Sequence, residues 1–72
     1  MITVRVMRDT DLRPVEGAEV LVEFHDSLQE RRSYTDPRGE ADILESGGFG
    51  TVYVNGLRRY SGDLFGVVSV RL

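Results

Sequence analysis

"SYTDPRGEADIL", residues 33–44, interrupts an alternation of polar and apolar residues with a sharp turn. Its tetrapeptide DPRG, residues 36–39, has the composition of a type I β-turn, because aspartate can accept from the turn's own backbone and proline presets φ at the second position. Gly39 tolerates the exit from such a turn. We therefore predict a β-hairpin, with residues 30–35 leading into the turn and residues 40–44 leading out.

The same period-two alternation, typical of strands with one buried face, recurs along the rest of the chain. No segment has the pattern of a helix longer than one turn. We predict seven strands, at residues 2–8, 18–24, 30–35, 40–44, 51–54, 57–61 and 65–72. Short strands separated by turn signals are typical of two packed sheets, so the sequence predicts an all-β sandwich that forms a single domain.

Glycine and asparagine mark the other predicted turns. Asn55-Gly56 is the strongest two-residue hairpin signal, because both positions of a type I′ turn favour φ > 0. We predict a loop at residues 45–50 and a further turn at residues 62–63. Gly56 is expected to tolerate a larger side chain less well than Gly39, which only closes a type I turn.

The apolar residues of each predicted strand fall on one face, and these faces are expected to form the core between the two sheets. The predicted core consists of Val4, Val6, Val20, Val22, Phe24, Ile43, Val52, Val54, Val68 and Val70. Met7 and Leu21 fall on the opposite faces, where we expect them to add water-exposed apolar surface.

Composition excludes several classes of function. The 72 residues contain no cysteine and one histidine, so the chain alone cannot form a disulfide framework or a thiolate metal site. Nine arginines and twelve acidic residues give a formal net charge of −3, which disfavours nucleic acid as a partner. No apolar run reaches the ~20 residues of a membrane-spanning helix. Met1 leads straight into a strand pattern, without the signature of a signal peptide.

Two motifs resemble those of a known family. The segment "PVEGA" at residues 14–18 precedes the second predicted strand, and "TDPRG" at residues 35–39 contains the predicted turn. With the glycine-led "GTVYV" at residues 50–54, they resemble the carboxypeptidase regulatory-like domains, which have a transthyretin-like (prealbumin-like) Greek-key sandwich of seven strands. The chain departs from the family pattern at "SGGFG", where relatives have a Pro-Pro-Gly approach, and at Val52, where they have an aromatic residue.

The resemblance implies a non-catalytic accessory module. Such domains accompany peptidases, outer-membrane receptors, surface proteins and some carbohydrate-active enzymes, which favours an extracellular or cell-surface setting. Some relatives bind sugars, proteins or calcium, but no single set of binding residues transfers to this sequence. No cofactor is implied.

Tyr53, Arg58, Arg59 and Tyr60, on either side of the turn at residues 55–56, form a candidate ligand or partner surface. Arginine beside aromatic rings could stack on a sugar or a base, and the net charge favours a sugar. The alternative is a solvated strand face with cross-strand packing of tyrosine against arginine.

Asp9, Asp11 and Glu16 flank one loop and are candidate calcium ligands, because Ca²⁺ binds six to eight oxygen atoms. The spacing of an EF-hand is absent. The alternative is ordinary turn chemistry, in which aspartate side chains accept from their own backbone.

Glu23, His25 and Asp26 could suggest acid–base catalysis, but the sequence offers no nucleophile paired with the histidine. Glycine clusters precede no helix, so they do not predict a phosphate-binding loop. The residue inventory therefore argues against an enzyme. No catalytic site is predicted, and no metal site beyond the candidate calcium ligands.

We therefore expect a non-catalytic structural or protein-binding module that acts through its surface or its sheet edges, including association with itself. Residues 2–8 and 65–72 are the candidate edge strands, because an exposed edge offers unpaired backbone groups to another chain. The alternative is a carbohydrate-binding accessory domain of a secreted or surface protein, which three exposed tyrosines in a row would favour.

Overall fold

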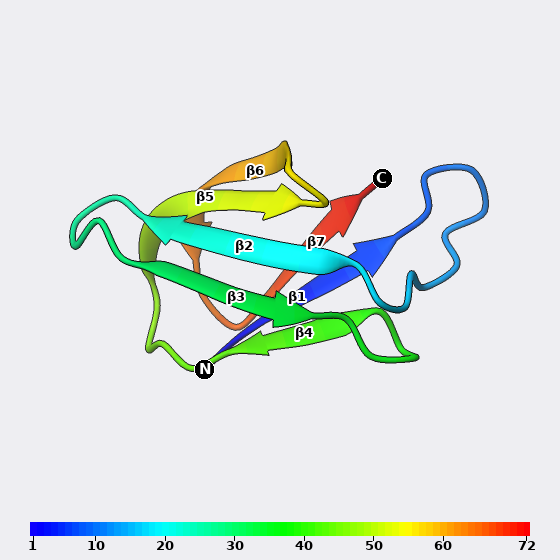
Figure 1. Ribbon diagram of the computed structural model, residues 1–72, viewed down its shortest axis with the longest axis horizontal. Helices are drawn as coiled ribbons and strands as arrows, with labels where there is room; N and C mark the ends of the chain where they lie inside the picture. The colour runs from blue at the N-terminus through cyan, green and yellow to red at the C-terminus, as the bar shows by residue number, and fades with distance from the viewer.

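Seven strands and no helix make up the protein in a computed structural model that describes residues 1–72 (Figure 1). The strands are β1 (Ile2–Met7), β2 (Glu19–Phe24), β3 (Glu30–Tyr34), β4 (Glu40–Ile43), β5 (Gly48–Val54), β6 (Leu57–Leu64) and β7 (Val67–Arg71). The prediction of an all-β chain with seven strands is confirmed. The structure contains no helix that is long and apolar enough to cross a membrane.

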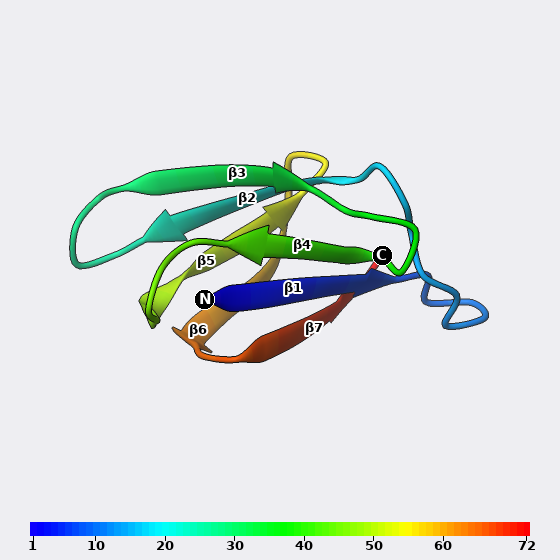
Figure 2. The same cartoon turned by 90° about the horizontal axis from the view of Figure 1, so that it is seen from below.

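The strands form two sheets in a β-sandwich-like arrangement (Figure 2). The three-stranded sheet has the order β4-β1-β7, and the four-stranded sheet has the order β3-β2-β5-β6. β1 and β7 run parallel, whereas all other neighbours are antiparallel. Parallel strands need a long connection between them, and here the connection contains the whole four-stranded sheet.

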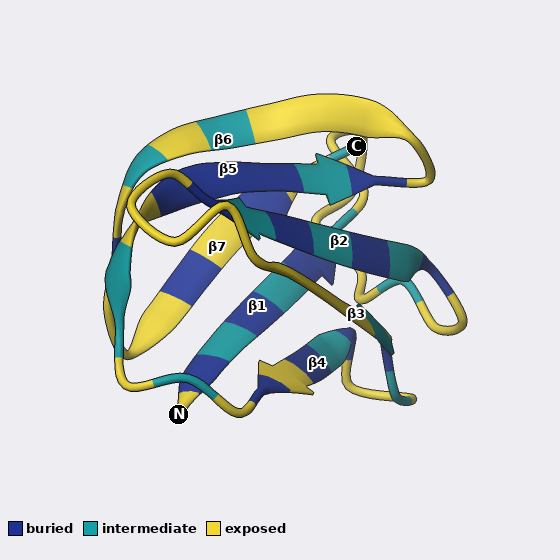
Figure 3. Ribbon diagram, turned by 60° about the vertical axis from the view of Figure 1, so that its left-hand side comes forward, coloured by how far each residue is buried: buried dark blue, intermediate teal, exposed yellow.

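Apolar side chains from both sheets fill the space between them. A cluster of 14 buried residues forms this core, and Figure 3 shows the alternation of buried and exposed residues along β7. All ten residues predicted for the core belong to the cluster, which also includes Ile2, Ala18, Ala41 and Leu64. Met7 and Leu21, which were expected to be water-exposed, are half-buried.

The turn at residues 36–39 connects the two sheets, so the predicted hairpin is wrong. The turn itself forms, because the N–H of Gly39 donates to the carbonyl of Asp36 at 2.8 Å. However, β3 before the turn pairs with β2, whereas β4 after it pairs with β1. Alternation determines which face of a strand is buried but not which strand lies beside it, so it cannot distinguish a hairpin from a crossover.

Gly39 is the more constrained of the two turn glycines. Its φ is +77°, and a β-carbon would lie 2.6 Å from the carbonyl oxygen of Val6 and 3.0 Å from Cβ of Pro14. Gly56 has φ +83° but no atom within 4 Å of such a β-carbon. With Asn55 at φ 51°, it forms the predicted type I′ turn between β5 and β6. The expectation that Gly39 is the more tolerant is therefore wrong, because close packing adds to its backbone requirement.

Thr35 joins the segments at residues 14–18 and 35–39, which lie side by side. Its hydroxyl donates to the carbonyl of Val15 at 2.6 Å and accepts from the N–H of Ala18 at 2.8 Å. Its backbone N–H donates to the carbonyl of Ala18 at 3.0 Å. Thr35 is buried, and these bonds hold the start of β2 against the end of β3.

Two predicted boundaries are also wrong. β5 begins at Gly48, inside the predicted loop, and residues 62–63 lie within β6 instead of forming a turn. The chain turns later, at Gly66, where φ is +60°. Glycine can stand within a strand where another backbone comes close, and a β-carbon at Gly50 would lie 2.5 Å from the carbonyl oxygen of Glu23.

β1 is the central strand of the three-stranded sheet, so the expectation that residues 2–8 form an exposed edge is wrong. β4 pairs with one side of β1 and β7 with the other. β7 does form an edge of this sheet, as expected for residues 65–72. The edges of the three-stranded sheet are therefore β4 and β7.

Candidate functional site: the edge of β7

Four strands form the edges of the two sheets: β4 and β7 in the three-stranded sheet, and β3 and β6 in the four-stranded sheet. An edge strand presents backbone N–H and C=O groups that have no neighbour, and another chain can pair with them. Proteins protect edges with charged side chains, bulges and short strands. The four edges of this protein differ in how far they are protected.

The backbone of β7 directs alternate residues toward β1. The N–H of Thr3 donates to the carbonyl of Gly66 at 2.8 Å, and the N–H of Leu72 donates to the carbonyl of Met7 at 2.9 Å. In a strand, the N–H and C=O groups of alternate residues point to the same side. The even-numbered residues of β7 therefore bond to β1. The backbone N–H and C=O groups of Val67, Ser69 and Arg71 lie in the plane of the sheet and point away from β1.

The side chains of β7 do not protect its edge. Val68 and Val70 are buried in the core, whereas Val67, Ser69 and Arg71 are exposed on the outer face of the sheet. Arg71 is the only charged residue of the strand, and β7 pairs with β1 in an unbroken register. Figure 2 shows β7 as the outermost strand of its sheet, with no segment beyond it.

β6 is protected by a bulge and by its own tyrosine. The register with β5 shifts between Val52 and Tyr53, and such a shift bends the strand and interrupts its edge. The hydroxyl of Tyr60 donates to the carbonyl of Asp63 at 2.8 Å, which occupies an acceptor near the end of the strand. β6 is therefore a poor template for a further strand.

β3 is protected by charge. All five of its residues are polar, and Arg31 pairs with the inward-facing Val22 of β2. The guanidinium of Arg31 forms an ion pair with Glu45 at 2.9 Å. An inward-pointing charge at an edge opposes the addition of another strand.

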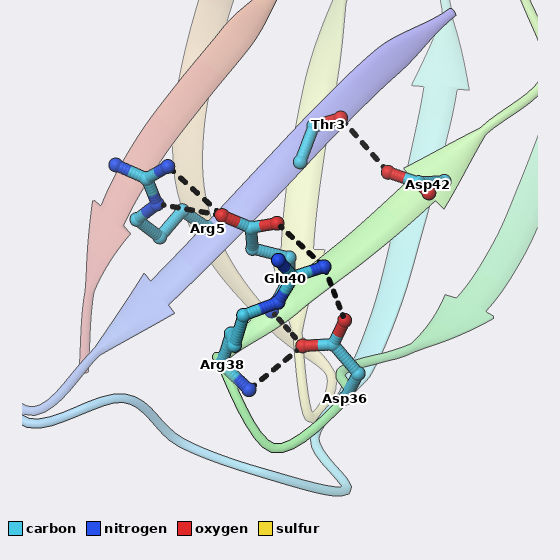
Figure 4. Close-up of polar contacts among 6 residues, drawn as sticks. All are labelled: Thr3, Arg5, Asp36, Arg38, Glu40 and Asp42. Carbon is cyan, nitrogen blue, oxygen red and sulfur yellow. Dashed lines mark hydrogen bonds and ion pairs between the residues drawn. The ribbon is translucent and has the colours of Figure 1, made fainter.

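β4 is short, and its start is already bonded. The backbone N–H of Glu40 donates to the carboxylate of Asp36 at 3.0 Å, and this bond, together with the N–H of Arg38 at 2.9 Å, lowers the pKa of Asp36. Arg5 donates to the carboxylate of Glu40 from two nitrogens, at 2.8 and 3.2 Å. Figure 4 shows these contacts together with the bond from Thr3 to Asp42 at 2.8 Å. They join β4 to β1 and the preceding turn.

The predicted ligand residues do not form one surface. Tyr53 and Arg58 lie opposite each other on the outer face of the four-stranded sheet. Tyr60 instead pairs with Val52, whose side chain is in the core, and it packs against the core from that side. The register shift places Arg59 between them as an additional residue. No feature of the sequence indicates this shift, which places the two tyrosines on opposite faces.

The candidate calcium ligands do not form a cluster, and Asp11 and Asp9 each have an arginine as partner. Two nitrogens of Arg8 donate to the two carboxylate oxygens of Asp11 at 2.6 and 3.1 Å, which lowers the pKa of Asp11. The backbone N–H two residues along also donates to Asp11, at 3.1 Å, as in ordinary turn chemistry. Asp9 lies 3.9 Å from Arg71, and Glu16 is exposed. No three acidic or histidine side chains come together where they could hold a metal ion.

His25 makes a contact that the sequence analysis missed. Its Nε2 lies 2.8 Å from Oγ1 of Thr51, which lies 3.4 Å from Oγ of Ser61. Thr51 is buried, and this contact satisfies its hydroxyl. Neither Glu23 nor Asp26 forms a hydrogen bond with the ring, so the three residues of the possible acid–base group are not joined by hydrogen bonds. The contact between His25 and Thr51 could have been predicted only if the pairing between β2 and β5 had been known.

A small pocket of about 190 Å³ lies where β2 ends and β5 begins. Phe24 and Phe49 supply its apolar lining, and Asp26 and Glu45 supply carboxylates. Glu45 already pairs with Arg31 at 2.9 Å. Ligand pockets typically have volumes of about 300–1,000 Å³, so this one is small for a binding site.

No protein-family model, curated protein or solved structure matches this chain. The comparisons therefore transfer no site to it. Among the four edges, that of β7 combines an unbroken register with a single charged residue, so its outward backbone groups are the least protected.

Proposed function

We propose that this protein is a non-catalytic binding module that associates with another polypeptide through the edge of β7. The observation that carries the proposal is the outward direction of the backbone groups of Val67, Ser69 and Arg71, in a strand without a bulge. Each of the other edges has a protection that β7 lacks. A polypeptide added here would extend the three-stranded sheet by one strand.

We also propose that the fold is a transthyretin-like Greek key and that the chain is a carboxypeptidase regulatory-like domain. The order β4-β1 supports this topology, because the fourth strand of a Greek key lies beside the first. The bonds of Thr35 support it as well, since they connect the two motifs on which the resemblance rests. Family likeness does not specify a binding partner, so the binding proposal rests on β7 itself.

The carbohydrate alternative has less support. It requires aromatic side chains in a row on one face, and Tyr60 lies on the other side of its sheet from Tyr53. Its hydroxyl is also occupied by the carbonyl of Asp63. Tyr34 is exposed on β3, but it pairs with Glu19, one row away from Tyr53.

Nuclear magnetic resonance can test strand addition with a defined probe. The probe is a synthetic hexapeptide of alternating threonine and valine, added to dilute ¹⁵N-labelled protein. We expect the amide signals of Val67, Ser69 and Arg71 to shift most, because their N–H groups would donate to the peptide. Ser69→Pro should abolish these shifts while the protein stays folded, since it removes a donor that β1 does not use. Ser69→Thr keeps the donor and is the matched control.

Two outcomes would contradict the proposed function. One is a set of peptide-induced shifts confined to β3 or β6, which would show that a protected edge is the better template. The other is an unchanged response in folded Ser69→Pro, which would show that the outward amide of β7 takes no part. Binding of soluble oligosaccharides with shifts at Tyr53 would favour the carbohydrate alternative.

A further inference from the structure

We infer that the edge of β7 pairs with the same edge of a second copy of this chain, antiparallel, with Ser69 on the two-fold axis. This inference rests on the proposed function, since it names the partner of the same edge. The pairing would join two three-stranded sheets into one continuous sheet of order β4-β1-β7-β7-β1-β4.

The backbone groups of β7 match this pairing. Ser69 would face the partner's Ser69, and Val67 would face the partner's Arg71. Each facing pair of residues with outward groups exchanges two N–H···O=C bonds in an antiparallel ladder. This register uses every outward backbone group of β7 between Val67 and Arg71.

The charges of the strand favour the same register. Arg71 is the one charged residue of β7, and here it lies opposite a valine. A register that placed the two copies of Arg71 opposite each other would oppose like charges, which destabilises a strand pair. The apolar stem of Arg71 can then cover the partner's Val67, which is 54% exposed in the single chain.

The core side of β7 is also complementary to itself. Val68 would face the partner's Val70 in a non-hydrogen-bonded pair, where side chains approach more closely. Both residues belong to the apolar cluster and retain slight exposure, 7% for Val68 and 4% for Val70. Contact between them would continue the core of one copy into that of the other.

The symmetric pairing of β7 with β7 of a second copy fits better than a pairing of β7 with a different edge strand, because the symmetric contact closes on itself. In an isologous pair, the same patch of both copies is buried and no binding edge of β7 remains. Pairing of β7 with β3 of another copy would instead bring it against Arg31 and its ion pair with Glu45. Such a head-to-tail contact would also leave free edges that either close into a ring or continue into a filament.

Opposite charge changes at Val67 test this register. Val67→Asp places a carboxylate opposite the partner's Arg71 at both ends of the symmetric pair, whereas Val67→Arg places like charges there. We expect Val67→Asp to strengthen dimerisation and Val67→Arg to weaken it, each by between about two-fold and thirty-fold in dissociation constant. Sedimentation equilibrium over a range of protein concentrations measures these constants.

A cysteine placed on the axis gives a second test. The chain has no cysteine, so Ser69→Cys can form a disulfide only between copies. Facing residues in an antiparallel ladder have Cα atoms about 5.5 Å apart, within the range of a disulfide. Under mild oxidation, we expect Ser69→Cys to cross-link at least about ten-fold faster than the control Asp42→Cys on the edge of β4, because pairing raises the local thiol concentration.

Equal cross-linking rates for the two cysteine variants would overturn the inference, and so would equal dissociation constants for the two Val67 variants. A parent protein that sediments as a monomer at every concentration would overturn it as well. If the threonine–valine hexapeptide still binds β7 in such a monomer, the proposed function stands and only the second copy is excluded. If the peptide also fails to bind, both proposals are excluded.

Discussion

Gly39 shows how much a single residue can be constrained by its surroundings. We expect Gly39→Ala to lower the free energy of unfolding by about 2–4 kcal/mol, because it combines an unfavourable left-handed φ with overpacking against the carbonyl of Val6. Gly56→Ala has the same kind of φ but open space around it, so it should cost only about 1 kcal/mol. Urea denaturation of the two variants measures both values. A larger loss at Gly56 would show that the contact between the turn and β1 is misplaced.

Leu28 is an opposite case, in which the present residue fits its backbone poorly. It has φ 55° and is 83% exposed, so its side chain gains little from packing. We expect Leu28→Asn to raise the free energy of unfolding by about 0.5–1 kcal/mol, because asparagine adopts left-handed backbone more readily. Leu44→Asn changes an equally exposed leucine without a positive φ and is the matched control. Thermal unfolding in which Leu28→Asn is no more stable than the parent would contradict this prediction.

The environments of single residues also show what the sequence can and cannot predict. Asn55 and Gly56 were placed correctly, because a type I′ turn depends on two neighbouring residues alone. The tight environment of Gly39 could not be predicted, since it depends on Val6 and Pro14, which are distant in the sequence. The contact of His25 with Thr51 was missed for the same reason.

At the scale of elements, the turn at residues 36–39 should make stability depend on pH. Hydrogen bonds from the backbone N–H groups of Glu40 and Arg38 lower the pKa of Asp36 in the folded protein below its ordinary value of 3.8. A lowered folded-state pKa stabilises the protein above the unfolded pKa, and this contribution is lost as the pH falls through the folded pKa. We therefore expect Asp36→Asn to lower the melting temperature at neutral pH and to have progressively less effect below pH 3.8.

Melting curves of the parent and Asp36→Asn across this acidic range give the comparison. Curves that stay equally far apart from neutral pH to the most acidic condition would contradict the assigned bonds. A carboxyl titration of Asp36 followed by nuclear magnetic resonance measures the pKa independently. It should lie below 3.8.

The alternation of apolar and polar residues does not predict the order of the strands in the sheets. The positions of all seven strands, and the buried faces of β1, β2, β4, β5 and β7, follow from local patterns, and the structure confirms them apart from some boundaries. Pairing of β1 with β7 and of β4 with β1 joins residues that are far apart in the sequence. Consequently, β1 was expected to form an edge, whereas the structure places it between β4 and β7.

At the scale of the whole molecule, the two sheets enclose one core and differ in how their edges are closed. Charge protects β3, a bulge and Tyr60 protect β6, and β4 is short. Only β7 combines a regular register with outward groups and apolar neighbours. The sequence predicted an edge at residues 65–72, but the protection of the other edges depends on tertiary contacts.

Concentration-dependent nuclear magnetic resonance of the ¹⁵N-labelled protein tests most directly whether the molecule associates through β7. As the protein concentration rises from micromolar to millimolar, the amide signals of Val67, Ser69 and Arg71 should shift, and their hydrogen exchange should slow. The amide of Asp42, on the opposite edge of the same sheet, should change little and serves as the internal control. Signals of β7 that remain constant while those of β3 or β6 move, or a spectrum that does not change at any concentration, would contradict self-association through β7.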